Sequence, residues 1–124
     1  MLETSSTIAN QNFSILIAPR ATERFISSTS LKRIKVKVVE QYEFKYVEMA
    51  SGAKHKVGGK VTDCSLNLGD FVTKVDLYVM ILGSYDIVIG MDWLESHDAI
   101  LNCNKKQLSL IDDLGQSRVI VGRS

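Results

Sequence analysis

The sequence has few of the residues that define several protein classes. Its 124 residues include one proline, two cysteines and two histidines. Because no Pro-, Gly- or Ser-rich stretch and no repeat interrupts the chain, we expect a single domain. Cys64 and Cys103 form no CxxC pair and stand beside no histidine cluster, which excludes the usual zinc patterns. The two cysteines also give only weak support for a disulfide. We therefore expect two reduced, mostly buried thiols, no metal, no cofactor and an intracellular, cytoplasmic protein.

Long hydrophobic runs are also missing. The longest apolar stretches, residues 15–18 and 78–82, are far shorter than the roughly 20 residues that a membrane-spanning helix needs. The first residues lack both the basic start and the apolar run of a secretory signal. The remaining composition, 45% hydrophobic and 23% charged with a mean hydropathy of +0.05, is typical of a globular protein. We expect one hydrophobic core.

Aspartate is absent from the first half of the chain, where the first one is Asp63. Residues 1–62 hold ten Lys/Arg and five Glu, whereas residues 63–124 hold five Lys/Arg and nine Asp/Glu, so the halves carry net charges of +5 and −4. Such an asymmetry can mark a nucleic-acid-binding face, but halves that interleave in the fold cancel it. Nucleic-acid binding is therefore kept as a minor alternative.

Alternating apolar and polar residues predict an all-β fold. The clearest example is V-T-K-V-D-L-Y-V at 72–79, which has the period of two that strands show. Turn signals such as Ser51-Gly52 and residues 112–115 separate the segments. Short strands at roughly ten-residue spacing favour a closed or sandwiched β architecture. The candidate strands are residues 13–17, 34–38, 44–49, 57–61, 64–68, 72–79, 85–89, 108–111 and 118–121.

Helical patterns are sparse. Residues 92–97 predict one short helix, with Asp92 accepting hydrogen bonds from the first free N–H groups and Glu95 as its capping-box partner. Residues 22–28 form a weaker helix candidate that could equally be a turn followed by a strand.

Residues that commonly carry catalysis are isolated in this sequence. A relay of Ser51, His97 and Asp98 can be drawn, but no G-x-S-x-G elbow or other positional motif supports it. We interpret His97, and His55 between its two lysines, as surface histidines. The other charged groups fit solvated turns and the solvent face of a strand: Asp112, Asp113, Lys32, Arg33, Lys35 and Lys37.

Three segments, read in order, resemble a known family. The run D-L-Y-V at 76–79, then Y-D-I-V-I-G-M-D-W-L at 85–94 with His97, Ala99 and Cys103 after it, is similar to the C-terminal half of the retropepsin-like aspartic protease domain of Ty3/gypsy-type retrotransposon polyproteins. Residues 50–61 resemble the flap hairpin of that family, and residues 13–17, 21–22 and 25–27 bracket the place of its active-site triplet. The resemblance covers residues 13–111. It implies a closed β-barrel with a flap (Ser51, Gly52, Ala53, Lys54) over an active-site floor (Ile87, Val88, Ile89, Gly90).

The sequence departs from the family at the triplet itself. Members carry Asp, then Ser or Thr, then Gly directly after the strand that corresponds to Leu16-Ile17, whereas this chain has Ala18-Pro19-Arg20. The resemblance implies a homodimer in which each subunit lends one aspartate to a pair that shares a proton. A symmetric dimer of this chain would have neither carboxylate. Pro19 also lacks a hydroxyl and an N–H, and Arg20 places a long cation where the family has glycine.

We therefore expect a retroviral-type aspartic protease-like domain that has lost its catalytic Asp, is inactive, and acts as an interaction or structural domain. Its cleft could still hold an extended peptide by strand addition. The alternatives are an aspartic endopeptidase of a retrotransposon polyprotein with residual or partner-dependent activity, and a basic nucleic-acid-binding module. We expect a homodimer, or a heterodimer with a related retropepsin-like chain. The predicted organisation is an N-terminal segment at 1–12, the retropepsin-like domain at 13–111, and a C-terminal strand at 112–124 as a candidate dimer element.

Overall fold

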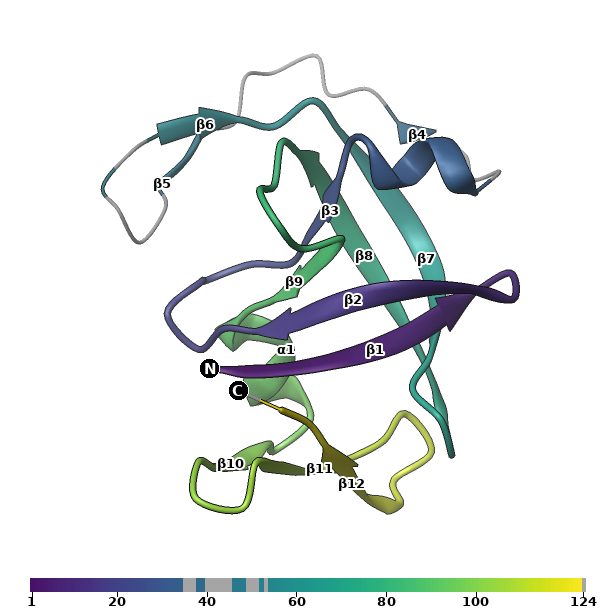
Figure 1. The fold of residues 1–124 in the computed structure, drawn as a ribbon, viewed down its shortest axis with the longest axis vertical. Helices are drawn as coiled ribbons and strands as arrows, with labels where there is room; N and C mark the ends of the chain where they lie inside the picture. The colour runs from purple at the N-terminus through teal and green to yellow at the C-terminus, as the bar shows by residue number, and fades with distance from the viewer. Residues whose placement is uncertain (35–37, 40–45, 49–51, 53, 124) are drawn as a thin grey trace.

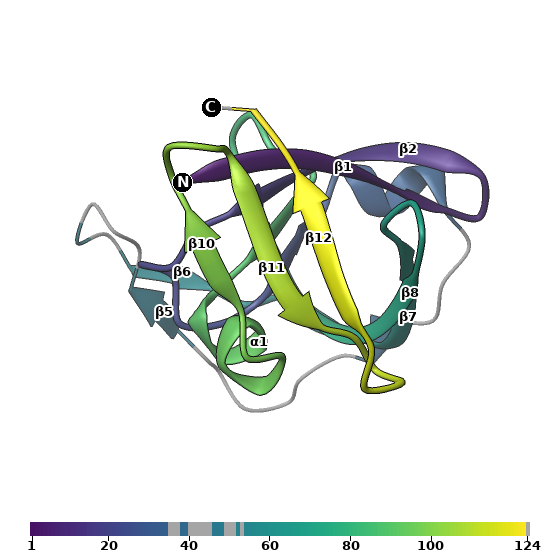
Figure 2. The ribbon, with the colours of Figure 1, turned by 90° about the horizontal axis from the view of Figure 1, so that it is seen from below.

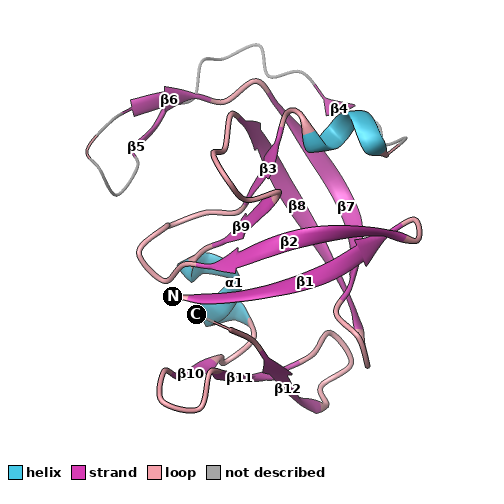
Figure 3. Ribbon diagram, viewed as in Figure 1, coloured by secondary structure: helices cyan, strands magenta, loops and turns pink. Residues whose placement is uncertain are grey.

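The structure is a computed structural model that describes residues 1–34, 38–39, 46–48, 52 and 54–123. Most of these residues lie in strands, as the colouring of Figure 3 shows. One α-helix, α1 (Met91–Ser96), and one short 3-10 helix (Ser30–Arg33) join them. The strands are β1 (Leu2–Ile8), β2 (Gln11–Ile17), β3 (Phe25–Ser27), β4 (Val38–Val39), β5 (Tyr46–Glu48), β6 (Lys54–Lys56), β7 (Gly59–Asn67), β8 (Val72–Met80), β9 (Ile87–Ile89), β10 (Ile100–Asn102), β11 (Gln107–Ile111) and β12 (Ser117–Val121).

The main sheet closes into a barrel. Its strand order is β1-β2-β9-β3-β8-β7-β4, and a further pairing of Thr7 with Asn67 joins β1 to β7, so that six of the seven strands form a ring (Figure 1). Two of the pairings are parallel, β2 with β9 and β3 with β8. The expected closed all-β fold with one short helix is therefore confirmed. Closure removes most of the free strand edges that an open sheet would expose.

A second, three-stranded sheet packs against the end of the barrel. It has the order β10-β11-β12 and lies in front of the barrel in Figure 2. Its inward side chains, Leu108, Leu110 and Ile120, join the same core as Trp93 and Leu94 of α1. The core is thus filled from both sheets and from the helix, as the alternation of buried and exposed residues requires.

Several strands differ from the sequence-based expectation. The candidates 57–61 and 64–68 are one strand, β7, with a register shift between Val61 and Cys64. Asp63 has a positive φ of 51° there, and its N–H donates to Asp76 Oδ1 at 2.9 Å. The gap between the two predicted strands is therefore a bulge, which bends a strand without ending it.

Residues 1–12, set apart as an N-terminal segment, contain a strand of the barrel. β1 pairs with β2 along its whole length, from Leu2 opposite Ile17 to Ile8 opposite Gln11. At the other end of the chain, β12 pairs with β11 in the same molecule. The boundaries at 13 and 111, and the dimer role of residues 112–124, stay predictions.

The two helical expectations have different outcomes. α1 occupies 91–96, one residue earlier than predicted, and its N-cap is Gly90. Asp92 lies inside the first turn, where its Oδ1 accepts a hydrogen bond from the N–H of Trp93 at 2.7 Å. At residues 22–28 the helix is wrong and the alternative, a turn followed by a strand, is confirmed, since β3 occupies 25–27 and pairs with β8 and β9. No helix in the described part of the chain is long and apolar enough to cross a membrane.

The opposite charges of the two halves meet within the fold. Among the described residues, three ion pairs join a cation of the first half to a carboxylate of the second. A fourth, between Arg123 and Glu3, joins a cation of the second half to a carboxylate of the first at 3.6 Å. This interleaving cancels much of the +5 and −4 asymmetry. The three pairs are Arg24 with Asp92 at 3.6 Å, Arg33 with Asp86 at 2.9 Å and Lys60 with Asp76 at 3.4 Å.

The two thiols differ in exposure. Cys64 is buried in the core, and burial raises the pKa of its thiol, whereas Cys103 is exposed. The expectation that both would be mostly buried is wrong for Cys103, because β10 ends at the preceding residue and the chain enters a turn at the surface.

This difference predicts selective thiol chemistry. In the native protein, Ellman's reagent is expected to react quickly with one thiol, and with both only after unfolding, because the buried, protonated thiol of Cys64 is a poor nucleophile. The absorbance at the end of the fast phase measures the number of thiols that react in the native protein. Cys103→Ser should remove the fast phase, and a fast phase that persists in this variant would contradict the assignment.

Candidate functional site

The chain turns sharply where β2 ends. The N–H of Ala21 donates to the carbonyl of Ala18 at 3.0 Å and closes a four-residue turn. Pro19 occupies the second position, where its fixed φ suits a turn and its missing N–H is not needed. Arg20, at the third position, is exposed. Ala18 is buried, and its N–H donates to the carbonyl of Ile89 at 2.9 Å. Residues 18–21 thus form a turn that is held both by its own hydrogen bond and by β9.

The segment 87–90 lies directly beside this turn. β9 pairs in parallel with β2, with Ile15, Leu16 and Ile17 opposite Ile87, Val88 and Ile89, so that Gly90 follows next to Ala18. The backbone approaches closely here, because a Cβ on Gly90 would lie 2.6 Å from the carbonyl oxygen of Ala21 and closer still to that of Glu23. Two further hydrogen bonds hold the loop against α1, from Met91 N–H to Ala21 O at 2.7 Å and from Asp92 N–H to Thr22 O at 3.2 Å.

Asp86 joins the start of this segment to distant parts of the barrel. Its carboxylate accepts hydrogen bonds from the N–H and Oγ of Ser14 at 2.8 and 3.2 Å and from Ser30 Oγ at 2.6 Å, and it pairs with Arg33 at 2.9 Å. The guanidinium of Arg33 also lies 4.2 Å from the ring centroid of Phe13. Partial burial alone would raise the pKa of Asp86, but these donors outweigh it and lower that pKa.

A second apolar cluster lies on the other side of the strands from the main core. We call it the site face. Alternate residues point to opposite faces of a strand, so Leu16 and Val88 belong to it while their neighbours enter the core. Half of its members are only partly buried. Buried members are Ala18, Phe25, Val57, Met80 and Val88, and partly buried ones are Leu16, Ala21, Tyr78, Leu82 and Tyr85.

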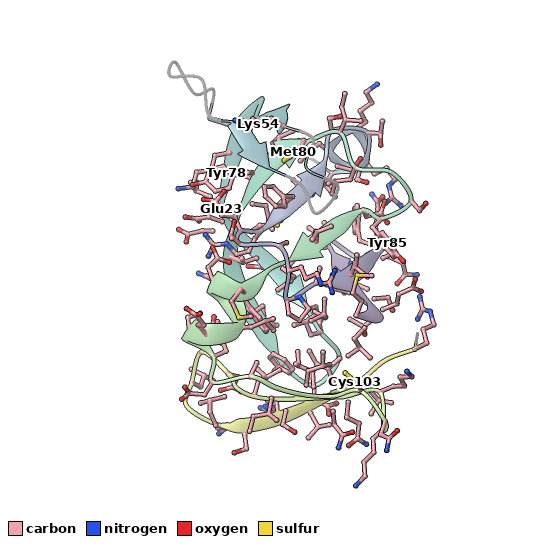
Figure 4. All side chains as sticks on the ribbon, turned by 90° about the vertical axis from the view of Figure 1, so that its left-hand side faces the viewer. Glu23, Lys54, Tyr78, Met80, Tyr85 and Cys103 are labelled. Carbon is pink, nitrogen blue, oxygen red and sulfur yellow. The ribbon has the colours of Figure 1, made fainter. Side chains whose placement is uncertain are left out.

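A hairpin of β5 and β6 lies on the same side of the molecule as the 18–24 loop in Figures 1 and 2. Its strands pair antiparallel, with Glu48 opposite Lys54. Gly52 has a φ of 87°, a conformation that suits glycine at a hairpin tip, and Lys54 is exposed. Figure 4 faces this side, and the labelled Lys54, Met80, Tyr78 and Glu23 all lie in the upper part of that view. Ser51 and Ala53 lie outside the described residues.

The aspartates around the turn are engaged in structural contacts. The carboxylate of Asp86 makes the four contacts described above, to Ser14, Ser30 and Arg33. Asp92 pairs with Arg24 at 3.6 Å and accepts the N–H of Trp93. Both carboxylates are therefore occupied by partners within the fold. Among the described residues, no group of three or more His, Cys, Asp or Glu side chains could hold a metal ion.

The fold and the sequence both match known proteins. The sequence matches the PEG10/RTL1 protease domain over residues 14–118, which include the turn and the whole site face. The chain belongs to this retropepsin-like family.

The solved structures show the fold alone. The retroviral protease-like domain of Ddi1 from Leishmania major has a TM-score of 0.74 and 16% identity, and the alignment covers 100% of this chain and 94% of that one. A Legionella pneumophila protein of unknown function has a TM-score of 0.42 and 15% identity over 76% of this chain and 84% of that one. No curated protein matches the sequence significantly.

In this retropepsin-like domain the other candidate residues take structural roles. His97 stacks on Trp93 with ring centroids 4.2 Å apart, and its Nε2 contacts Asp113 Oδ1 at 2.8 Å. Asp113 also accepts hydrogen bonds from Thr73 Oγ1 at 2.9 Å and Lys74 N–H at 3.0 Å, which links β8 to the residue that follows α1. The expectation that His97 is simply a surface residue is wrong, because its ring is packed and bonded. Of the relay drawn with Ser51 and Asp98, Ser51 lies outside the described residues.

The expectation that Asp112 lies in a solvated turn is also wrong. It is buried, with 6% of its surface exposed, and not solvated. Its carboxylate accepts hydrogen bonds from Arg118 Nε at 2.8 Å and from the N–H groups of Gln116 and Leu114 at 2.9 and 3.0 Å, and these lower its pKa. The basic residues at 32–37 were expected on a strand face, but Lys32 and Arg33 lie in the 3-10 helix. Lys35 and Lys37 lie outside the described residues, and nothing is described of the His55 side chain.

The hydrogen bonds and ion pairs of four aspartates predict acid sensitivity. Folding lowers the pKa of Asp76, Asp86, Asp112 and Asp113. A lowered pKa contributes stability that is complete above the unfolded-state value, about 3.9, and is lost as the pH falls through the folded-state value. Urea unfolding at a series of pH values should therefore give a free energy of unfolding that drops below about pH 4.

The matched variants are Asp86→Asn and Asp70→Asn. Asp86→Asn should lower stability at neutral pH and flatten the drop in acid, since one linked group is gone. Asp70 is exposed and carries no such contacts, so its variant should follow the parent curve. Identical acid curves for the parent and Asp86→Asn would contradict the role assigned to Asp86.

Proposed function

We propose that this chain is a retropepsin-like domain without peptidase activity that acts as an interaction domain and holds extended peptide segments on its site face. The observation that carries the proposal is the turn after β2. It stands where the resemblance places the catalytic triplet, yet it consists of Ala18, Pro19 and Arg20. The barrel, the hairpin and the close approach at Gly90 are all in place around it.

The missing carboxylate removes the chemistry of the family. Peptide hydrolysis by an aspartic protease needs one carboxylate to accept a proton from water and its neighbour to donate one. The methyl group of Ala18 can do neither, and the nearby Asp86 and Asp92 are held by other partners. Because each positioned acid–base group contributes roughly 10²–10⁴-fold, the loss of both from a dimer leaves no useful rate.

The binding surface does not depend on that carboxylate. An extended peptide is recognised by main-chain hydrogen bonds and by apolar side chains at alternate positions. The site face offers partly buried apolar groups from four strands and loops, among them Leu16, Tyr78 and Leu82. The β5–β6 hairpin on the same side of the molecule would act as the flap over such a peptide.

The domain would act as a homodimer or as a heterodimer with a related retropepsin-like chain. Val119 and Val121 of β12 are 55% and 67% exposed, which leaves an apolar stretch open to a partner. Sedimentation velocity over a range of concentrations measures this directly. A profile that stays monomeric up to millimolar protein contradicts dimerisation and leaves the peptide-binding role to be tested separately.

A cleavage assay tests the lack of activity. The purified domain is incubated from acid to neutral pH with a diverse peptide mixture, and products are followed by mass spectrometry. No cleavage is expected, and reproducible cleavage that pepstatin blocks overturns the proposal. The partner-dependent alternative is tested by adding an active retropepsin. A mixed dimer has one aspartate that cannot fill both proton roles, so an excess of this chain should inhibit the active enzyme.

A further inference from the structure

We propose that the turn at 18–21 selects an acidic peptide, with Arg20 binding the carboxylate of a glutamate or aspartate in the segment that lies on the site face. The inference rests on the proposed function and deepens it, because it names the chemistry of the occupant. The residue that departs most from the family pattern thus supplies a binding group where a catalytic group was lost.

The first support is that Arg20 has no partner among the described residues. The other arginines of the described chain are engaged: Arg24 with Asp92, Arg33 with Asp86, Arg118 with Asp112 and Arg123 with Glu3. Arg20 is exposed and forms no ion pair or hydrogen bond with a described residue. An arginine left open in a chain that pairs its other arginines is a candidate for an external anion.

The second support is the surroundings of that arginine. Its neighbours Ala18 and Ala21 both belong to the site face, so the cation stands at the border of an apolar surface. A bound peptide would exclude water there and strengthen the attraction between opposite charges. Lys54, at the start of β6, is a second exposed cation on the same side of the molecule, and it too has no ion-pair partner in the described part of the chain. Glu23 is the acidic residue of the same loop, and it is engaged in an interaction of its own.

The third support is rigidity. The turn is closed by its own hydrogen bond and is fixed to β9 and α1 by three more, from Ala18, Met91 and Asp92. A fixed backbone reduces the entropy lost when Arg20 binds a ligand. A guanidinium binds a carboxylate through two parallel N–H groups, which favours an acidic side chain over a neutral one.

The experiment compares two labelled peptides by fluorescence anisotropy. In one, glutamate is flanked by valines on both sides; in the other, glutamine replaces the glutamate. The parent domain is expected to bind the glutamate peptide at least about tenfold more tightly, the ratio for a hydrogen bond to a charged group. Arg20→Gln should bring that ratio close to one. Lys32→Gln, which removes an exposed and unpaired cation of the 3-10 helix, is the matched control and should keep the ratio.

The possible outcomes separate the two proposals. Equal affinity of the parent for both peptides overturns the acidic selectivity and leaves peptide binding standing. If Arg20→Gln and Lys32→Gln lower the ratio of the two affinities equally, the acidic selectivity is also overturned, because the attraction would then depend on the total charge of the domain. Absence of binding to either peptide overturns the proposed function itself. Displacement of the glutamate peptide by a single-stranded RNA that binds more tightly overturns both in favour of nucleic-acid binding.

Discussion

The variant Ala18→Asp/Pro19→Thr/Arg20→Gly is expected to cleave peptides at acid pH, at least about a hundredfold above the background of the parent chain. The three substitutions restore the Asp-Thr-Gly order that the resemblance implies for this turn. The backbone that would carry the new carboxylate is already positioned by the hydrogen bond from the residue 18 N–H to the carbonyl of Ile89. Pepstatin-sensitive cleavage of a fluorogenic peptide measures the gain.

Two features distinguish this gained activity from cleavage by a contaminating protease. The rate per chain should rise with protein concentration, because each active site needs two aspartates, one from each of two subunits. The control variant Ala18→Asn/Pro19→Thr/Arg20→Gly has the same turn and an amide of similar size, so it should fold alike and remain inactive. An active asparagine variant, or a well-folded and dimeric aspartate variant without activity, would contradict the placement of the triplet at residues 18–20.

Gly90→Ala is expected to lower the free energy of unfolding by at least about 3 kcal/mol. The added Cβ would lie 2.6 Å from the carbonyl oxygen of Ala21 and closer to that of Glu23. Backbone oxygens cannot rotate away as a side chain can, so the 18–24 loop must move off the start of α1. Urea unfolding measures the loss.

Gly83→Ala is the matched control, since a Cβ on Gly83 meets nothing within 4 Å. Its stability should stay close to that of the parent. The displaced loop should also weaken peptide binding by Gly90→Ala in conditions where the variant is still folded. Equal stability of the two variants would mean that the 18–24 loop moves away from the added Cβ at little cost and is not held against β9.

The strands that the sequence predicts are those with apolar side chains on one face. β8 and β9 are examples, because Val75, Leu77 and Ile87 alternate with polar or differently facing residues. β1 has no such signal. Its inward side chains are Leu2, Thr4, Ser6 and Ile8, so that hydroxyl groups occupy half of its buried face and the run reads as polar. Tertiary pairing with β2, and not local pattern, makes it a strand.

The candidate site divides in the same way. The resemblance predicts the place of the triplet from short contiguous runs on either side of it. The contacts that hold the turn and its surroundings could not be predicted. Asp86 contacts Ser14 and Ser30 across 72 and 56 positions, and Asp113 reaches Thr73 across 40. A single sequence holds no signal that brings such residues together, because closure of the barrel alone decides their neighbours.

The two ends of the described chain meet at one edge of β1. Glu3 and Arg123 exchange backbone hydrogen bonds at 2.7 and 2.8 Å, and Tyr85 donates to the carboxylate of Glu3 from the side. A domain with adjoining ends tolerates circular permutation through a short linker, with new ends at a tip such as Gly69. For the same reason, the domain can be inserted into a surface loop of a host protein without separating the two host residues that flank the insertion.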